Sequence, residues 1–200
     1  MGIIIKQSIL SGILVGIGIV VNTQTSNQYI GAMLFSIALL VIIECELKLY
    51  TGKIGYFKFA SIKDLIIMLI CNLIGVMIPF LIAFNKDGAY EQFLYISEIK
   101  FSNGYLELFL YGLMCGVLMF IAVHCKKIII TVFCIMTFIL SEYEHCVADF
   151  PYLCINFNIE HLLKFLCIVA GNSLGSIAIH QLIIITEKQQ NKINKLKGEK

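Results

Sequence analysis

The chain of 200 residues contains no tryptophan and no arginine, only two prolines, and charged residues at 14%. Hydrophobic residues make up 59% of it, whereas soluble domains average about 45–50% apolar residues and about 25% charged ones. The mean hydropathy is correspondingly high at +0.89. This composition excludes an ordinary soluble domain and indicates a protein whose solvent is the lipid bilayer.

Patterns typical of other protein classes are also missing. The apolar segments show no alternation of period two, which favours helices over a barrel. No small-residue cleavage site follows the first apolar segment, so a removed signal peptide is not expected. The eight cysteines form no paired C-x-x-C units, and most lie in apolar segments, where free cysteine behaves as a small hydrophobe. We therefore expect no cofactor, no metal site and no disulfide framework.

Six apolar stretches approach the roughly 20 residues that a helix needs to cross a bilayer. They predict an all-α membrane protein, a single transmembrane domain over residues 1–200. The first and fifth stretches are short, so each must extend into its flank or continue after a break. The stretches are Ser8 to Val21, Tyr29 to Leu49, Leu65 to Phe84, Leu106 to Val123, Ile128 to Leu140 and Leu162 to Ile185.

The lysines predict the orientation, because basic residues near span ends are retained in the cytoplasm. Three lysines, Lys86, Lys100 and Lys164, fall on one side of a six-span alternation, and the other twelve fall on the opposite side. We therefore expect a multi-pass protein of the cell membrane with both termini cytoplasmic. Residues 187–200 read as a basic, solvated tail that touches anionic lipid and not nucleic acid.

An internal repeat with an offset of one hundred residues divides the chain into halves, at about 1–85 and 104–186. Gly12 and Gly16 recur as Gly112 and Gly116, and Asn72 with Gly75 recurs as Asn172 with Gly175; Glu44 likewise recurs as Glu144. Each half holds three spans, an odd number, so the second half must be inverted relative to the first, as in many transporters. The spaced glycines are expected to let helices pack closely.

The second and fifth spans are both interrupted by ionisable residues where an apolar run should continue. The first interruption is followed by Gly52 and the second by Pro151, residues that end or kink helices. Both spans therefore look like broken helices. In transporters, broken helices at corresponding positions of the two halves line the substrate path.

The residues of these interruptions resemble the formate/nitrite transporter family. The similarity lies in FSIALLVIIECELKLYTG, residues 35–52, and in SEYEHCVAD, residues 141–149. It extends over nearly the whole chain. The resemblance implies an aquaporin-like protomer in a homopentamer, with one path for formate, nitrite or hydrosulfide through each protomer.

The resemblance also assigns residues to that path. It implies that His145 is the central pore histidine, that Thr51 is the threonine of the broken second helix, and that Phe35 with Leu39 forms one hydrophobic constriction and Phe138 the other. Four positions depart from the family pattern. Gly116 stands where the family has a pore-facing asparagine, Glu46 and Lys48 stand for a glycine and an acidic residue, and Asp149 stands for the asparagine that closes the histidine motif.

His145 is the most informative residue without any resemblance, because an ionisable group at membrane depth is costly and usually functional. Its imidazole can pair with an anion or supply a proton. Two other interpretations remain open: a neutral histidine held by hydrogen bonds to Thr51 or Glu144, and a metal site of Glu144, His145 and Asp149. Glu144 itself is expected to orient the break near the membrane interface.

These features favour a channel or transporter for the small monovalent anion of a weak acid, and not an enzyme, because no nucleophile or phosphate loop accompanies Glu144 and His145. A membrane-embedded enzyme that uses these two residues is one alternative. A non-transporting membrane scaffold is another, although it would leave the broken helices without a role.

Overall fold

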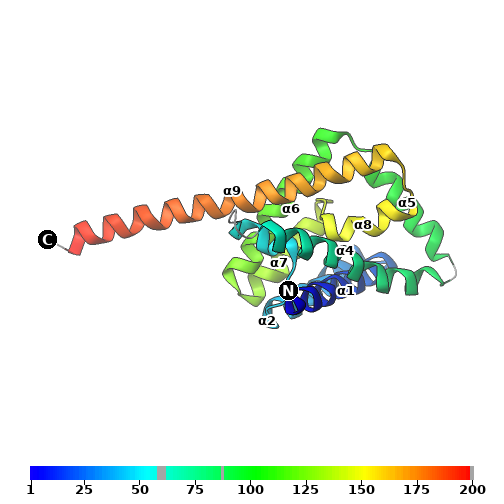
Figure 1. Ribbon diagram of the computed structural model, residues 1–200, viewed down its shortest axis with the longest axis horizontal. Coiled ribbons are helices and arrows are strands. Elements are labelled where there is room, and N and C mark those ends of the chain that lie inside the picture. Colours follow the sequence, from blue (N-terminus) through cyan, green and yellow to red (C-terminus); the bar gives the residue numbers. More distant parts are fainter. Residues whose placement is uncertain (58–61, 87, 199–200) are drawn as a thin grey trace.

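The computed structural model describes residues 1–57, 62–86 and 88–198, and within these residues the protein is all helical, without strands (Figure 1). Two lysines of the charge pattern, Lys58 and Lys200, lie outside the described residues. Four helices are long and apolar enough to cross a membrane: α1 (Gly2–Gln24), α4 (Ile62–Phe84), α6 (Tyr105–Cys125) and α9 (Ile159–Gly198). The protein is thus an integral membrane protein, as its composition predicts.

The remaining helices are shorter. The apolar helices α2 (Gln28–Glu44) and α7 (Ile128–Leu140) are each followed by a non-helical segment and a further short helix. After α2 come α3 (Tyr50–Lys53) and the 3-10 turn η1 (Ile54–Tyr56), and after α7 comes α8 (Cys146–Ile155). The first apolar stretch extends into its flanks and the fifth stops at a break, so the two short predicted spans follow the two courses expected of them.

The break after α2 is made by the backbone and not by glycine. The N–H of Leu47 donates to the carbonyl of Ile42, and the N–H of Glu46 donates to the carbonyl of Ile43. This is the Schellman arrangement of a helix C-terminus. It places Glu46 in the left-handed region with φ of 51°, a conformation that usually belongs to glycine.

The break after α7 repeats this geometry. Tyr143 N–H donates to Phe138 O, Glu142 N–H donates to Ile139 O, and Glu142 has φ of 54°. The expectation that Gly52 and Pro151 end these helices is wrong, because they lie inside α3 and α8. The backbone turns at Glu46, six residues before Gly52, and at Glu142, nine residues before Pro151.

Replacing Glu46 with glycine is expected to stabilise the protein by about 0.5–1 kcal/mol, since a left-handed non-glycine residue costs about 1–2 kcal/mol and glycine loses part of that gain to entropy. The measurement is thermal unfolding of purified protein in detergent. Glu46→Ala removes the same side chain but keeps the strain, and serves as the control. A lower melting temperature for Glu46→Gly than for Glu46→Ala would contradict the assignment.

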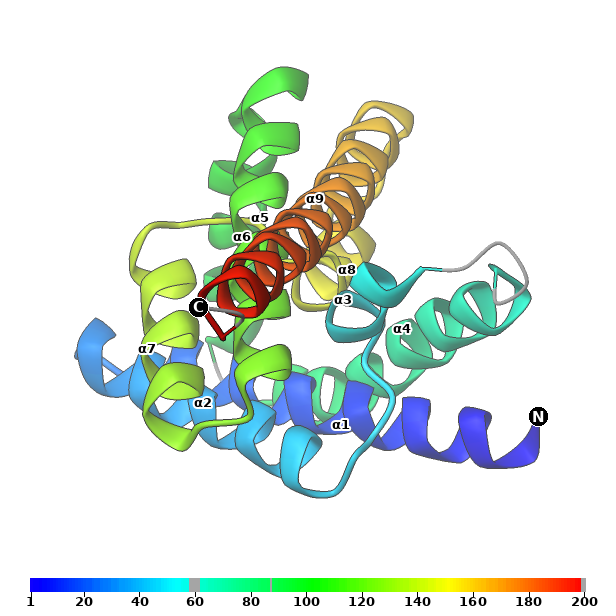
Figure 2. The same cartoon turned by 90° about the vertical axis from the view of Figure 1, so that its left-hand side faces the viewer.

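Two helix pairs form the body: α1 packs along α4, and α6 packs along α9. Figure 2 looks along α9, with α6 beside it and α4 beside α1. A Cβ on Gly12 would lie 2.2 Å from the carbonyl oxygen of Asn72, and a Cβ on Gly116 would lie 2.2 Å from that of Asn172. The prediction that these glycines permit close helix contacts is confirmed.

The same contacts show that a single offset of one hundred residues does not relate all of the repeated positions in the two halves. Gly12 corresponds by its contact to Gly116, not to Gly112. Asn72 and Gly75 keep the predicted offset to Asn172 and Gly175, whereas the glycines of α1 and α6 do not, because the segments that join the helices differ in length between the halves. α9 continues beyond the body as one straight helix (Figure 1), and its residues from Thr186 to Asn194 are exposed, as the sequence predicts for a solvated extension.

Candidate functional site

His145 lies at the break before α8 and is 2% exposed. Its Nδ1 accepts a hydrogen bond from the N–H of Ala148 at 3.1 Å and thereby caps α8. Its Nε2 lies 2.8 Å from Oγ1 of Thr51 on α3. Because Nδ1 accepts from the backbone, the ring proton belongs on Nε2. The two breaks therefore meet at a neutral imidazole that donates to the Thr51 hydroxyl.

Asn172 fixes the segment that carries this histidine. It is fully buried on α9. Its Oδ1 accepts from the N–H of Cys146 at 2.9 Å, and its Nδ2 donates to the carbonyls of Glu144 and Gly112, both at 2.8 Å. A backbone that leaves helical geometry has unpaired polar groups. One amide side chain satisfies them here.

Asn72 does the same for the other break. Its Oδ1 accepts from the N–H of Tyr50 at 2.8 Å, and its Nδ2 donates to the carbonyls of Ser8 and Lys48 at 2.7 and 2.9 Å. The contacts therefore match Glu144 with Lys48, and the predicted correspondence of Glu44 with Glu144 is wrong. Glu44 is the last residue of α2.

Phe35 and Phe138 face one another at the site. Their ring centroids are 5.9 Å apart in an edge-to-face arrangement, and the Phe138 ring is also 5.9 Å from the imidazole of His145. The expectation that these phenylalanines belong to two separate constrictions is therefore wrong. The two rings form one aromatic constriction beside the histidine.

A cavity of about 370 Å³ opens on one side of this constriction. Among its lining residues are both phenylalanines, His145, Lys100, Glu144 and Asp149. On the other side lies a very small cavity of about 10 Å³, to which Leu39, Leu49 and Met119 contribute together with the same phenylalanines and histidine.

A third cavity of about 40 Å³ shares Leu49 with the small one and reaches Lys53, Lys126 and Glu46. The three cavities therefore lie next to one another, the first two sharing Phe35, Phe138 and His145 and the last two sharing Leu49. They run from a wide polar vestibule, past two phenylalanines and a histidine, to a narrow region flanked by lysines.

The structure brings most of the predicted path residues together, but not all of them. His145, Phe35, Phe138 and Leu39 line the cavities, and Thr51 lies behind them on the imidazole. Gly116 lines none of these three cavities, because it packs against the backbone of Asn172. The absence of a side chain at Gly116 lets α6 approach α9 closely.

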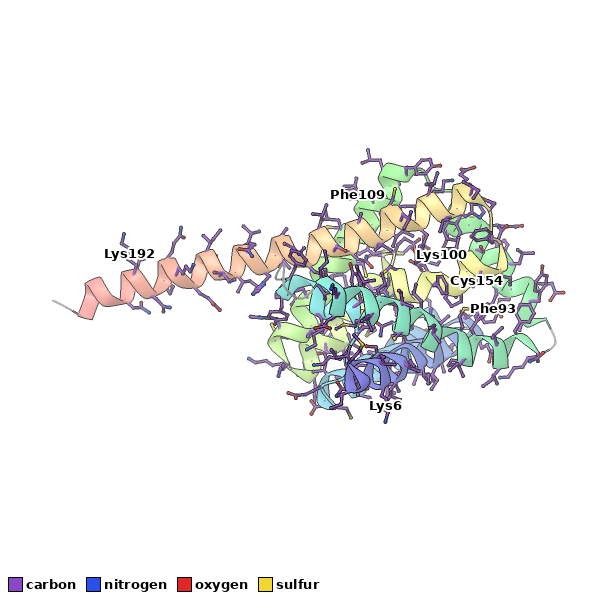
Figure 3. All side chains as sticks on the ribbon, in the orientation of Figure 1. Lys6, Phe93, Lys100, Phe109, Cys154 and Lys192 are labelled. Carbon is purple, nitrogen blue, oxygen red and sulfur yellow. The ribbon has the colours of Figure 1, made fainter. Side chains whose placement is uncertain are left out.

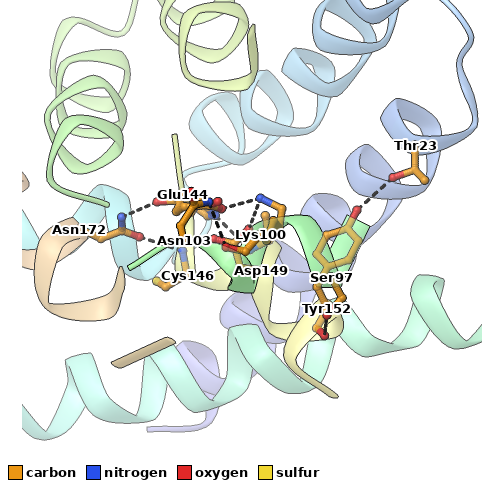
Figure 4. Close-up of polar contacts among 11 residues, drawn as sticks. Thr23, Ser97, Lys100, Asn103, Glu144, Cys146, Asp149, Tyr152 and Asn172 are labelled. Atoms are coloured by element: carbon orange, nitrogen blue, oxygen red, sulfur yellow. Dashed lines mark hydrogen bonds and ion pairs between the residues drawn. The ribbon is translucent and has the colours of Figure 1, made fainter. Parts of the chain in front are cut away.

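Glu144 is buried beside α5 (Ala89–Ser102). It is 3% exposed, and its Oε2 pairs with Nζ of Lys100 at 2.5 Å. The same ammonium lies 3.1 Å from Oδ1 of Asp149 (Figure 4). Among the described residues, no group of three or more metal-ligating side chains is found.

Sequence reasoning missed Lys100. It lies on α5, a helix between the third and fourth apolar stretches, where the sequence predicts no span. Figure 3 labels Lys100 within the body of the protein, and Figure 4 shows its side chain meeting Glu144 and Asp149. The available signal was its place among the three lysines on the acidic side of the chain, because a cation amid carboxylates predicts an ion pair.

Comparison with known proteins identifies the fold. A family model described as formate/nitrite transporter matches residues 2–186. The chain is 25% identical to a protein of Bacillus subtilis (strain 168) named "Uncharacterized transporter YwcJ", over 78% of this chain and 74% of the relative. It superposes with a TM-score of 0.80 on a "Pentameric formate channel with formate bound", at 18% identity and over 93% of this chain and 96% of the other.

A second solved structure, an "FNT family ion channel", superposes with a TM-score of 0.77 at 20% identity. It is matched over 92% of this chain and 89% of its own. These likenesses extend over nearly the whole described chain, so the arrangement of its helices is that of this group of channels.

Proposed function

Because the chain belongs to the formate/nitrite transporter family, whose members are channels and transporters and not enzymes, we propose that it conducts the small monovalent anion of a weak acid, of the formate, nitrite or hydrosulfide type. The observation that carries this proposal is a row of three cavities, of which the wide and the smallest share Phe35, Phe138 and His145. The solved structure with formate bound supports the substrate class.

The aromatic constriction sets the physical problem for an anion. Moving a bare ion from water into a low-dielectric medium costs on the order of 20 kcal/mol in the idealised Born estimate. A weak acid avoids most of this cost if it crosses with a proton, whereas chloride cannot. The Lys100 ammonium at the wide cavity attracts the anion, and the rings then admit the small neutral acid.

His145 assists this passage as a hydrogen-bond donor. Its Nε2–H is bonded to the Thr51 hydroxyl at 2.8 Å, and an acid that enters the narrow region accepts from this N–H and hydroxyl pair in place of water. Protonating Nδ1 would break the hydrogen bond from Ala148 that caps α8. We therefore favour a neutral imidazole that donates at Nε2 over one that surrenders a proton.

His145→Asn is expected to lower formate flux by about threefold to tenfold, because an amide still caps α8 but no longer presents an N–H at the ring position, and a hydrogen bond to a neutral acid contributes about 0.5–1.5 kcal/mol. The measurement is uptake by purified protein in liposomes, with formate, nitrite, hydrosulfide and chloride. His161→Asn is the control, since His161 stacks on Phe101 away from the path.

Unchanged formate flux in His145→Asn would remove the histidine from the mechanism. Absence of flux for all four anions in the parent protein would overturn the transport function. It would favour the alternative of a non-transporting membrane scaffold.

The proposal includes the architecture around the path. We propose two inverted three-helix repeats of aquaporin-like type, broken after α2 and α7, in a cell membrane with both termini cytoplasmic. The matching hydrogen bonds that Asn72 and Asn172 make to the two breaks support the repeat. We also propose a homopentamer with one path in each protomer, supported by the pentameric relative. Native mass spectrometry in detergent tests the assembly.

A further inference from the structure

Resting on the proposed anion path, we propose that Asp149 and Glu144 share one proton, and that loss of this proton closes the wide cavity to anions. The pair would make a pH-dependent entry filter, separate from the histidine. It depends on Asp149, the position at which this chain departs from the family motif.

One ammonium faces two carboxyl groups in this cluster. Lys100 Nζ lies 2.5 Å from Glu144 Oε2 and 3.1 Å from Asp149 Oδ1, and the two acidic side chains are only 4% and 3% exposed. If both were ionised, the cluster would carry one uncompensated negative charge away from water. Buried charges without partners are costly and neutralise instead.

The second oxygen of Asp149 indicates where the proton lies. Oδ2 is buried and has no hydrogen-bond partner among donors of the described residues. The Asp149 carboxyl lies beside that of Glu144, because both contact the same Lys100 ammonium. Two carboxylates are both acceptors, so they can bond only when one of them carries a hydrogen. A proton on this pair satisfies the free oxygen and balances the charge.

The surroundings offer no other compensation within the described residues. Apart from Lys100 on α5, the ionisable side chains that interact with this pair are uncharged at neutral pH in their ordinary form. They are Cys115 of α6 and Cys146 and Tyr152 of α8, and the Tyr152 hydroxyl is bonded to that of Thr23 on α1. His145 lines the same cavity as Lys100, and its ring is neutral because Nδ1 accepts the N–H of Ala148. A proton is therefore the simplest counter-charge.

The charge state then decides whether an anion can approach Lys100. With the proton bound, the cluster is neutral and the ammonium can attract an anion from the cavity. When the proton leaves to cavity water, the cluster has a net charge of −1 at the mouth of the constriction. At an effective dielectric constant of about 20, one charge several ångströms away is sufficient to reduce anion entry about tenfold or more.

The test compares formate flux at alkaline and acidic pH in liposomes. The ratio of flux at alkaline pH to flux at acidic pH should be about tenfold lower in the parent than in Asp149→Asn. In that variant the site can no longer become negatively charged. Glu142→Gln is the matched control, because it removes an exposed carboxylate that lines the same cavity. It should shift the ratio by less than about twofold, since surface charges are screened.

An infrared measurement tests the proton without transport. The purified parent at neutral pH should show the C=O band of a protonated carboxylic acid, and Asp149→Asn should lack it. Absence of this band in the parent would overturn the proposal even if the protein transports formate. A parent that shows the band but carries no anion would retain the proton site and overturn only the transport function. Equal ratios in the parent and Asp149→Asn would overturn the filter.

Discussion

Replacing Lys100 with methionine is expected to destabilise the protein by about 3–5 kcal/mol, the usual cost of removing one partner from a buried ion pair. The ammonium contacts both Glu144 and Asp149 and holds α5 against the start of α8. Methionine has a similar length but leaves two buried acids without a cation. The measurement is thermal unfolding in detergent, with the amount of folded protein recovered as a second readout.

The control is Lys86→Met, because the Lys86 ammonium is exposed and bonds only to Gln24 at 3.2 Å among the described residues. It should change stability by less than about 1 kcal/mol. Neutralising the acids, as in Lys100→Met with Glu144→Gln and Asp149→Asn, should recover part of the loss, because no charge is then left unpaired. If Lys100→Met unfolded at the temperature of the parent, the cluster would have no structural role.

Replacing Asn172 with leucine is expected to cost about 2–6 kcal/mol, because it leaves two buried backbone groups without partners at about 1–3 kcal/mol each. The groups are the N–H of Cys146 and the carbonyl of Glu144, whereas the Gly112 carbonyl keeps its hydrogen bond within α6. In the membrane interior no water replaces these bonds. Unfolding temperature measures the loss, and formate flux should fall with it, because His145 lies between two of these residues.

Asn85→Leu is the matched control. Asn85 is exposed and bonds only to the carbonyl of Leu81 at the end of α4 among the described residues, so its loss should cost less than about 1 kcal/mol. If Asn172→Leu had the unfolding temperature and the formate flux of the parent, the break after α7 would not need the hydrogen bonds of Asn172. The expected stabilising role of this asparagine would then be wrong.

The helices that cross the membrane could be predicted from the sequence alone. The thickness of the hydrocarbon region sets the length of an apolar run, and this is a local property that composition displays. The same holds for the polar interruptions that mark the two breaks. The motif around His145, and Thr51 in the matching interruption, were likewise visible from the residue types and a family resemblance.

Which residue makes each turn was not visible. Glu46 and Glu142 adopt the left-handed conformation, although Gly52 and Pro151 lie close by and have the stronger propensity to end a helix. A left-handed glutamate costs only about 1–2 kcal/mol. Tertiary contacts, such as the hydrogen bonds of Asn72 and Asn172 to the backbone of the two breaks, outweigh this cost. Local propensity therefore predicted that the helices break, but placed the cause at the wrong residues.

Which residues from distant segments contact one another was decided only by the tertiary structure. Lys100 lies 44 residues before Glu144 and 49 before Asp149, on a helix that the sequence presented as a loop, and the fold alone brings the three together. The contact of Phe35 with Phe138 and the packing of Gly116 on Asn172 are also long-range. The sequence by itself determined which segments leave water, because that depends on each segment alone. Pairings between segments depend on how the helices cross, which no single segment encodes.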